Sequence, residues 1–164
     1  MIDLKEIKNK IFKKENFYFL IVVFIIFFFD RYSKIQIINN LSDNAFYIND
    51  ILNFNLVWNT GIGFGIFSSS SNLIYNLISA LIFIVILFLI FIFLKSNKLD
   101  KTFFSLIIAG ALGNFYDRMT FKAVPDFIDF HYGNFHWFTF NIADIFVSIG
   151  VICFLVKSLF TKEQ

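Results

Sequence analysis

Four long apolar stretches, separated by polar segments, dominate the pattern of residues along the chain. Each stretch approaches the roughly 20 residues that an α-helix needs to cross the hydrocarbon core of a bilayer. The first, Phe17–Phe29, is short, and we expect its helix to continue through polar residues to about Ile38. The pattern therefore predicts four membrane-spanning helices, over residues of about 17–38, 72–94, 102–121 and 140–160.

Two polar segments, 39–71 and 122–139, lie on the same side of these predicted spans. Ile51–Trp58 alternates apolar and polar residues, which is typical of a half-buried strand. Three glycines over residues 61–65 follow and permit bends and close backbone approach. The second segment reads as a loop rich in aromatic residues and aspartates. The fold class that we expect is an all-α membrane protein. It is a four-transmembrane-helix bundle with a small extracytoplasmic β-rich segment lying on the membrane, in one domain over 1–164.

Composition supports a membrane location. The chain has 164 residues, of which 58% are hydrophobic and 27 are Phe, with a mean hydropathy of +0.72. A soluble domain of this size has too much surface to hide so many apolar side chains. The formal net charge of +2 is too small to indicate nucleic-acid binding. The single cysteine, Cys153, excludes a disulfide within the chain and a metal site built on several cysteines.

Basic residues predict the orientation. Ten of the 14 lie in the N-terminal tail, in the 95–101 loop and in the C-terminal tail, and the other four lie near the opposite ends of the spans. Because cytoplasmic loops are enriched in Lys and Arg, we expect both termini in the cytoplasm and the two polar segments outside. The N-terminus resembles a signal peptide, but no small-residue cleavage site follows its apolar core. We therefore expect it to remain as the first span.

Ionisable residues gather at the outer ends of the predicted spans, where they are costly and usually paired or functional. Three residues of the first span share a helical face by their i, i+3, i+4 spacing: Asp30, Ser33 and Lys34. The third span has a similar face, formed by Gly110, Asn114, Asp117 and Arg118. One interpretation of these charges is a structural network, with Arg118 as one partner of a buried pair that locks the bundle. The other is a binding site, in which Asn114 would hydrogen-bond a ligand.

Asp126 and Asp144, which are 18 residues apart, are the candidates for chemistry. Asp144 lies about 6 Å from the start of the fourth predicted span, at ~1.5 Å per residue, which is shallow enough for water. The intervening loop is long enough to bring the two carboxylates together. Two close carboxylates share one proton, so that one activates water and the other protonates a peptide carbonyl. The alternative is structural: Asp126 as a turn residue after Pro125, and Asp144 as a polar contact between helices.

Two histidines, His131 and His136, are five residues apart in the aromatic loop and form no HExxH motif. We interpret them as interfacial or structural residues, and we expect neither a metal nor another cofactor. Cys153 reads as a small apolar filler in the fourth span.

Five short motifs follow one another along the chain. They are Asp30–Lys34 (D-x-x-S-K), Trp58–Gly61 (WNTG), Gly110–Asn114 (G-x-x-G-N, with Asp117-Arg118 just after it), Val124–Phe127 (VPDF) and Phe140–Asp144 (F-N-x-x-D). Together they resemble the lipoprotein signal peptidases, the type II signal peptidases of bacteria, over nearly the whole chain. Members of that family usually have Ala-Ala-Phe after Asn-Thr-Gly, whereas this chain has Ile62-Gly63-Phe64.

The resemblance implies a polytopic aspartic endopeptidase of the bacterial inner membrane. Such enzymes remove the signal peptide from diacylglyceryl-modified prolipoproteins, cutting just before the lipidated Cys. The family's catalytic pair falls on Asp126 and Asp144, without a metal, and Asp129 is given no catalytic role. The other motif residues, which bind substrate or hold the site, fall on Asp30, Lys34, Asn59, Gly110, Asn114, Asp117, Arg118 and Asn141. We expect a monomer with its active site at the outer face, and a lipid-modified prolipoprotein and membrane lipids as its partners.

Two other classes of protein remain as alternatives. One is a metal-dependent membrane transferase that acts on lipid headgroups with Mg²⁺ bound by aspartates, although a clustered Asp-rich helical motif is missing. The other is a transporter or channel subunit, which charges in the middle of the spans would favour; here the charges gather at one end.

Overall fold

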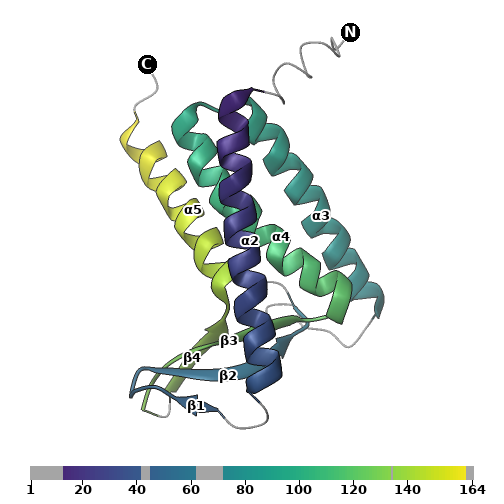
Figure 1. Ribbon diagram of the computed structural model, residues 1–164, viewed down its shortest axis with the longest axis vertical. Helices are drawn as coiled ribbons and strands as arrows, with labels where there is room; N and C mark the ends of the chain where they lie inside the picture. Colours follow the sequence, from purple (N-terminus) through teal and green to yellow (C-terminus); the bar gives the residue numbers. More distant parts are fainter. Residues whose placement is uncertain (1–12, 42–44, 62–71, 134, 162–164) are drawn as a thin grey trace.

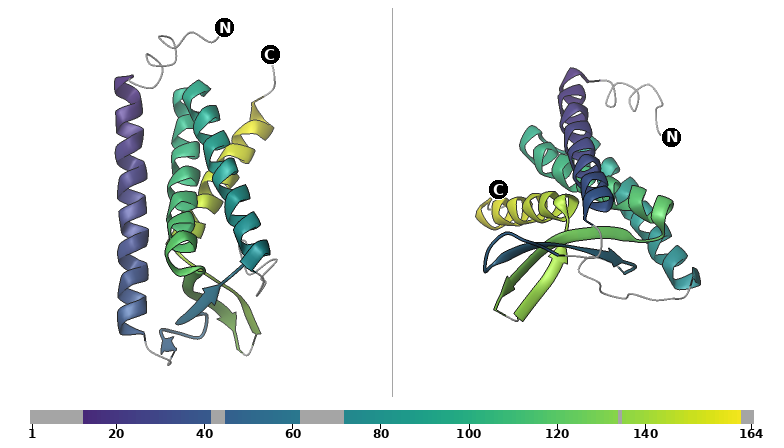
Figure 2. Two further views of the ribbon diagram at one scale, coloured as in Figure 1. Left: turned by 90° about the vertical axis from the view of Figure 1, so that its right-hand side faces the viewer. Right: turned by 60° about the horizontal axis from the view of Figure 1, so that its bottom comes forward.

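The computed structural model describes residues 13–41, 45–61, 72–133 and 135–161. The expectations for the N-terminal lysines up to residue 12, and for the glycine-rich stretch from Ile62 to Phe64, lie outside these residues. Within them, four helices form a bundle and a small sheet covers one end of it (Figure 1). The two further views show the same division into bundle and sheet (Figure 2).

The helices coincide with the four predicted apolar stretches, each with slightly different ends. They are α2 (Lys14–Asn40), α3 (Asn72–Lys95), α4 (Lys98–Phe121) and α5 (Ile142–Phe160). Helix α4 packs against each of the other three. The Asn97 side chain accepts a hydrogen bond from the backbone N–H of Asp100, and this N-cap fixes where α4 begins. A core of Phe104, Ile107 and Ile108 on α4 packs against residues of α2, α3 and α5.

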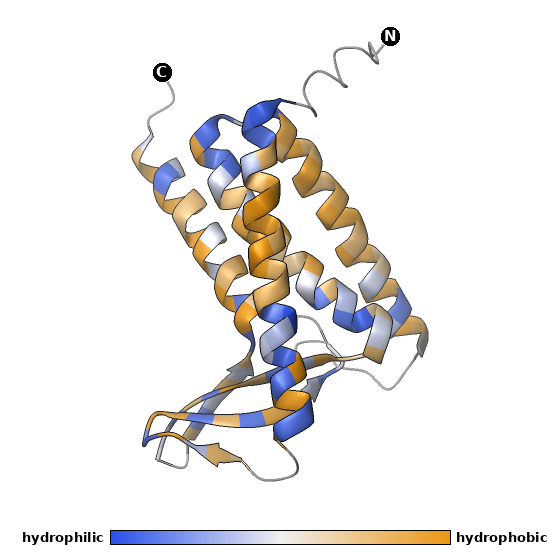
Figure 3. Ribbon diagram, in the orientation of Figure 1, coloured by the Kyte–Doolittle hydropathy of each residue, from blue (hydrophilic) through white to orange (hydrophobic). Residues whose placement is uncertain are grey.

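Two helices of the described residues are long and apolar enough to cross a membrane. They are Leu73–Lys95, with a mean hydropathy of 3.5, and Ile142–Phe160, with a value of 2.2. Helix α2 carries Asp30, Arg31 and Lys34 in its C-terminal half, and α4 has charged residues at both ends. Figure 3 shows these hydrophilic segments at the sheet end of α2 and α4, whereas α3 is apolar along most of its length. The prediction of four spans is therefore not confirmed.

The sheet is antiparallel, with its strands in the order β1-β2-β3-β4. The strands are β1 (Phe46–Tyr47), β2 (Leu52–Asn59), β3 (Val124–Tyr132) and β4 (Phe135–Phe140). Strand β2 confirms the strand predicted at 51–58. The prediction of a loop over 122–139 is wrong, because this segment forms the hairpin β3–β4. The sequence lacks alternation there because β3 lies between two strands and against the bundle, so that its first six residues are all buried.

Strand pairing brings the site together. Val57 pairs with Asp126 and Asn59 with Val124, so the end of β2 lies beside the start of β3. Strand β4 ends at Phe140 and leads through Asn141 directly into α5. The hairpin thus places Asp126 close to the first turn of α5, next to Asn141, which donates a hydrogen bond to its carboxylate.

Candidate functional site

Asp144 lies in the first turn of α5, where it takes part in a capping box. The Asn141 side chain accepts a hydrogen bond from the Asp144 backbone N–H at 3.1 Å. In return the Asp144 carboxylate accepts from the Asn141 backbone N–H at 3.2 Å. This reciprocal arrangement satisfies two donors that a helix start would otherwise leave without partners. It also fixes the direction in which the Asp144 carboxylate points.

Asp126 comes from β3 and is 2% exposed. Two amides donate to its two oxygens: Asn59 Nδ2 at 2.9 Å and Asn141 Nδ2 at 2.5 Å. Burial is the main cause that raises the pKa of Asp126, to about 6, and the nearby Asp144 carboxylate adds to it. The two amide donors work in the opposite direction because they favour the ionised form. The carboxyl therefore keeps its proton to a higher pH than an ordinary aspartate.

Asn141 links the two carboxyl groups. Its amide nitrogen donates to Asp126, while its amide oxygen accepts from the backbone N–H of Asp144. Asn114 on α4 holds the Asp144 carboxylate from the other side, with Nδ2 at 2.8 Å from Oδ1. The structure thus brings Asp126 and Asp144 into one site, and three asparagines, at 59, 114 and 141, hold them there.

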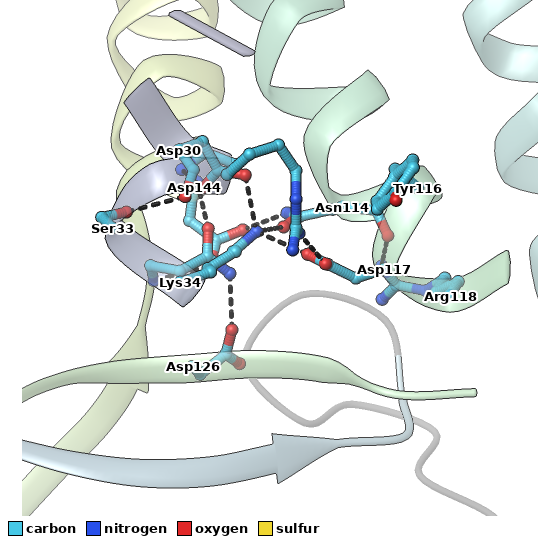
Figure 4. A network of polar contacts seen from close by, with 12 residues as sticks. Asp30, Ser33, Lys34, Asn114, Tyr116, Asp117, Arg118, Asp126 and Asp144 are labelled. Atoms are coloured by element: carbon cyan, nitrogen blue, oxygen red, sulfur yellow. Dashed lines mark hydrogen bonds and ion pairs between the residues drawn. The ribbon is translucent and has the colours of Figure 1, made fainter. Parts of the chain in front are cut away.

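Lys34 is the centre of a charged network next to this pair, drawn in Figure 4. Its ammonium group lies 2.9 Å from Asp30 Oδ2, 2.8 Å from Asp117 Oδ2 and 2.9 Å from Asn114 Oδ1. The side chains of Lys34, Asp30 and Asp117 are all fully buried, so the charge of Lys34 is balanced inside the protein. Through Asn114 the network reaches Asp144, which links it to the candidate catalytic pair.

Two glycines of α4 allow the other helices to approach this network. A Cβ on Gly110 would overlap the backbone carbonyl oxygen of Ala143 on α5. A Cβ on Gly113 would lie 2.5 Å from the Asp30 carboxylate on α2. Asp30 in turn accepts a hydrogen bond from the Ala143 backbone N–H at 2.9 Å. The motif glycines therefore permit α2, α4 and α5 to meet at one point.

The expectation that Arg118 belongs to a buried ion pair is wrong for the residues described. Its guanidinium donates to two backbone carbonyls, that of Gly61 at 2.6 Å and that of Asn114 at 3.2 Å. Consecutive helix residues point about 100° apart, so Arg118 faces the end of β2 while Asp117 faces α2. Arg118 thus secures the end of β2, close to Asn59.

Arg31 forms the ion pair that Arg118 does not. Its guanidinium contacts the Asp117 carboxylate and lies 4.8 Å from the centre of the Tyr116 ring. Sequence reasoning missed this role, although the position next to Asp30 in the first motif was a signal. Together Arg31 and Lys34 supply two cations to Asp117 and Asp30.

The two histidines do not reach the candidate catalytic pair of Asp126 and Asp144. His131 and His136 lie at the far end of the β3–β4 hairpin, where His136 Nδ1 contacts the Asp129 carboxylate at 2.8 Å. Among the described residues, Asp129, His131 and His136 are the one group of carboxylate, imidazole and thiol side chains close enough to share a metal ion. Asp126 and Asp144 are not members of that group.

The geometry suits general acid–base chemistry on a peptide bond. One buried carboxyl with a raised pKa stands beside a second, and both are held by neutral amide donors. Such a pair can polarise a carbonyl and activate a water molecule without a nucleophilic side chain.

Comparison with known proteins agrees with this class. Two solved structures, each described as a bacterial membrane enzyme, resemble the chain with TM-scores of 0.77 and 0.75 at 28% and 29% identity. The first match covers 90% of this chain and 93% of that one, and the second covers 88% and 94%. The fold is therefore that of a bacterial membrane enzyme.

Sequence relatives identify the family. The family described as signal peptidase (SPase) II matches residues 22–160. The lipoprotein signal peptidase of Pelagibacter ubique (strain HTCC1062) is 46% identical over 160 residues, covering 95% of this chain and 96% of the relative. That of Anaplasma marginale (strain Florida) is 43% identical over 139 residues, with 83% and 81% covered. The chain belongs to the signal peptidase II family, the lipoprotein signal peptidases, which cleave signal peptides from prolipoproteins. This confirms the resemblance and favours a peptidase over a transferase or a transporter.

Proposed function

We propose that this chain is an aspartic endopeptidase whose catalytic pair is Asp126 and Asp144. It removes signal peptides from diacylglyceryl-modified prolipoproteins and cuts just before the lipidated Cys. The observation that carries the proposal is the link through Asn141, which binds both carboxyl groups at once. A single asparagine in contact with both acids fixes their mutual position better than the chain alone would.

The reaction follows from this geometry. The pair holds one proton, because joint ionisation of two close carboxylates is unfavourable. The ionised member removes a proton from water, and the resulting hydroxide attacks the scissile carbonyl carbon. The protonated member donates to the carbonyl oxygen, and the tetrahedral intermediate then breaks its C–N bond as the amine takes up a proton. Neither a metal nor another cofactor takes part.

The remaining motif residues position the pair and the substrate. Asn59, Asn114 and Asn141 orient the carboxyl groups through neutral amides. Asp30, Lys34 and Asp117 hold α2 against α4 next to the pair, and Gly110 lets α5 approach. Arg118, through the Gly61 carbonyl, holds the end of β2.

We also propose that all four helices cross the inner membrane, as one domain over 1–164, with both termini in the cytoplasm and the sheet at the outer face. Helix α2 has 27 residues and α4 has 24, or about 40 and 36 Å at ~1.5 Å per residue, which is enough to span. Large apolar side chains on α2 and α3 are exposed, among them Phe28 at 61% and Phe88 at 60%, and they suit contact with lipid. The buried charges of α2 and α4 have partners within the bundle, which lowers their cost.

The substrate and the membrane lipids are the partners in this proposal, and the protein acts as a monomer. Every side chain assigned to the site comes from one chain, on β2, β3, α2, α4 and α5, so a second copy is not required to complete it.

The decisive experiment is cleavage of a lipidated prolipoprotein by the purified protein in detergent. Mass spectrometry should place the cut immediately before the lipidated Cys, and a chelator should leave the rate unchanged. The same substrate without its diacylglyceryl group is the control and should be cut much more slowly. A rate that falls to background on chelation and returns with a divalent ion would replace the aspartic mechanism by a metal-dependent one.

The orientation is tested by labelling single cysteines in a Cys153→Ser background. Ala45→Cys and Tyr132→Cys are at the sheet end and should react with an impermeant reagent added outside intact spheroplasts. Lys98→Cys, at the opposite end of α4, should react only after the membrane is opened. Reversed labelling of these variants would overturn the proposed topology.

A further inference from the structure

The tip of the β3–β4 hairpin carries a cluster of metal-ligating side chains that the peptidase reaction does not use. The ligand atoms of Asp129, His131 and His136 all lie within 4.8 Å of one another. Asp129 and His131 are buried, at 3% and 8% exposed, while the His136 side chain is 57% exposed. The cluster is therefore both pre-formed on its inner side and open to solvent on its outer side.

His131 gives an independent sign that a ligand belongs here. Its Nδ1 atom is buried and has no hydrogen-bond partner among the described residues. Asp129 Oδ2 lies 3.9 Å from this atom, which is too far for a hydrogen bond. The His131 Nδ1 atom nevertheless faces the other members of the cluster. A buried polar atom without a partner is costly, and a ligand that binds it removes that cost.

The strand register shows how the three side chains come to share one face. Asp129 and His131 are two residues apart on β3, so they point to the same side. On β4, Asp129 pairs with Thr139, Phe130 with Phe138, and His131 with His136, which leaves Trp137 as an extra residue. Without this bulge His136 would point to the opposite side, because every residue beyond it would change face.

We propose that Asp129, His131 and His136 bind a Zn²⁺ ion, or a divalent transition metal of the same class. One carboxylate and two imidazoles, with water in the fourth position, form a common tetrahedral ligand set for zinc. Ligands at ~2.0–2.1 Å from a tetrahedral ion lie about 3.3 Å apart. The distances of 2.8 Å from Asp129 Oδ2 to His136 Nδ1 and 3.9 Å to His131 Nδ1 lie on either side of that value. Small side-chain movements are enough to complete the site.

Asn53 on β2 supplies the outer support that such a ligand needs. Its side-chain amide lies 3.4 Å from His131 Nε2. With the ion on Nδ1, the neutral ring carries its proton on Nε2 and donates it to the Asn53 amide oxygen after a half-turn of the amide. The backbone N–H of His131 also donates to the Ile51 carbonyl at 2.9 Å. The ion would thus join β2, β3 and β4.

This site is separate from the proposed catalytic pair. Asp126 lies three residues before Asp129 on β3, so the two side chains point to opposite faces of the strand. The ion stabilises the sheet that carries Asp126 without touching the reacting atoms. Its presence or absence is therefore independent of the aspartic mechanism.

The test uses the full-length protein without a histidine tag, stripped with a chelator and titrated with Zn²⁺ by calorimetry. His131 and His136 are the two histidines of the chain, so binding that depends on histidine is assigned to them. The expected result is one ion per chain, a higher Tm with Zn²⁺, and the visible absorption of a tetrahedral complex with Co²⁺. The cleavage rate of the stripped protein below its Tm should equal that of the loaded protein.

Variants decide whether the binding is at this site. His136→Asn changes the exposed ligand, so the fold should survive, and affinity should fall at least about tenfold with loss of the Co²⁺ spectrum. Asp50→Asn, on the exposed turn between β1 and β2, is the matched control and should bind as the original protein does. No stoichiometric binding, or equal affinity in His136→Asn, would overturn the proposal. A cleavage rate that falls on stripping would instead contradict the separation of the two sites.

Discussion

Two buried lysines at opposite ends of the bundle show how differently the same residue type is accommodated. Lys34, at the sheet end, is 0% exposed and contacts the carboxylates of Asp30 and Asp117, which are also 0% exposed. Lys101, at the other end, is 3% exposed and donates to Glu15 at 2.9 Å and to Asn16 at 2.7 Å. Glu15, however, is 42% exposed, so its charge stays hydrated.

The difference lies in what remains when the lysine is removed. At the Lys34 end, two carboxylates would stay buried beside the candidate catalytic pair, with Arg31 paired to Asp117 alone. A buried charge with too little compensation is severely destabilising. At the Lys101 end, Glu15 would return to water, as in an ordinary surface ion pair. The comparison teaches that the free-energy cost of burying charged side chains is concentrated at the end of the bundle where the catalytic pair is proposed. Four predictions test it, from the largest expected effect to the smallest.

The largest effect is expected from Asp126→Asn and Asp144→Asn. Each should lower the cleavage rate of a lipidated prolipoprotein by about 10³-fold or more, because Asn cannot exchange the proton that the pair shares. The double variant should be hardly slower than either single one, since the two acids act as a unit. Asp100→Asn is the matched control at the Lys101 end, where Asp100 pairs with Lys157, and it should retain full activity. Substantial cleavage by either single variant would remove the pair from the mechanism.

Lys34→Met is expected to have the largest effect on stability. Loss of the cation leaves Asp30 and Asp117 buried with less compensation, and breaking such a network costs about 3–5 kcal/mol. Thermal unfolding in detergent should show the loss, and the cleavage rate should fall as well, because Asn114 loses one of its partners. A change in unfolding free energy of less than about 1 kcal/mol would mean that the network is hydrated, as at the other end.

The raised pKa of Asp126 predicts that stability declines as the pH rises. Its pKa is about 6 in the folded protein against an ordinary 3.8, so the folded state holds the proton more tightly. The contribution of protonated Asp126 to the free energy of unfolding is fully present below pH 3.8 and is lost as the pH rises through about 6. The loss approaches about 3 kcal/mol, at 1.36 kcal/mol per pKa unit. Asp126→Asn should remove this decline, which Tm measurements from pH 4 to pH 8 on both proteins would reveal. Parallel curves for the two proteins would contradict it.

Lys101→Met should have the smallest effect. Because Glu15 remains hydrated, the expected loss of stability is about 1 kcal/mol or less, and the cleavage rate should not change. The pair of variants Lys34→Met and Lys101→Met, measured side by side, is the direct test of the comparison. Equal losses of stability would show that burial of the lysine alone, and not of its partners, sets the cost.

The elements that follow from local pattern could be predicted from the sequence. Long apolar stretches predicted the four helices, and alternation predicted strand β2. The gathering of ionisable residues at one end of the predicted helices indicated that Asp117 and Arg118 lie near Asp126 and Asp144. These predictions succeed because helix periodicity and strand alternation depend on neighbouring residues alone.

Features that depend on contacts between distant segments could not be predicted. The hairpin β3–β4 was missed because a strand buried on both faces shows no alternation. The pairing of Asp117 with Arg31 instead of Arg118 depends on the rotation of α4 against α2. The approach of His131 and His136 depends on a bulge at Trp137, which leaves no clear mark in the sequence. Charge content, which lowers the hydropathy of α2 and α4, kept the four-span prediction from being confirmed.

The capping box at Asn141 and Asp144 ties the position of a candidate catalytic carboxylate to the start of α5. Asp144 is the third residue of α5, and its carboxylate completes the cap. The position of this carboxylate along the axis of the bundle is therefore set by the residue at which the helix begins. Moving the carboxylate by one residue along α5 would shift it by about 1.5 Å and turn it by about 100°. Under the proposed orientation, the start of α5 thus sets the distance between the membrane and the peptide bond that is cleaved. Substrates would then be selected by where their apolar segment ends as much as by the residues that they present.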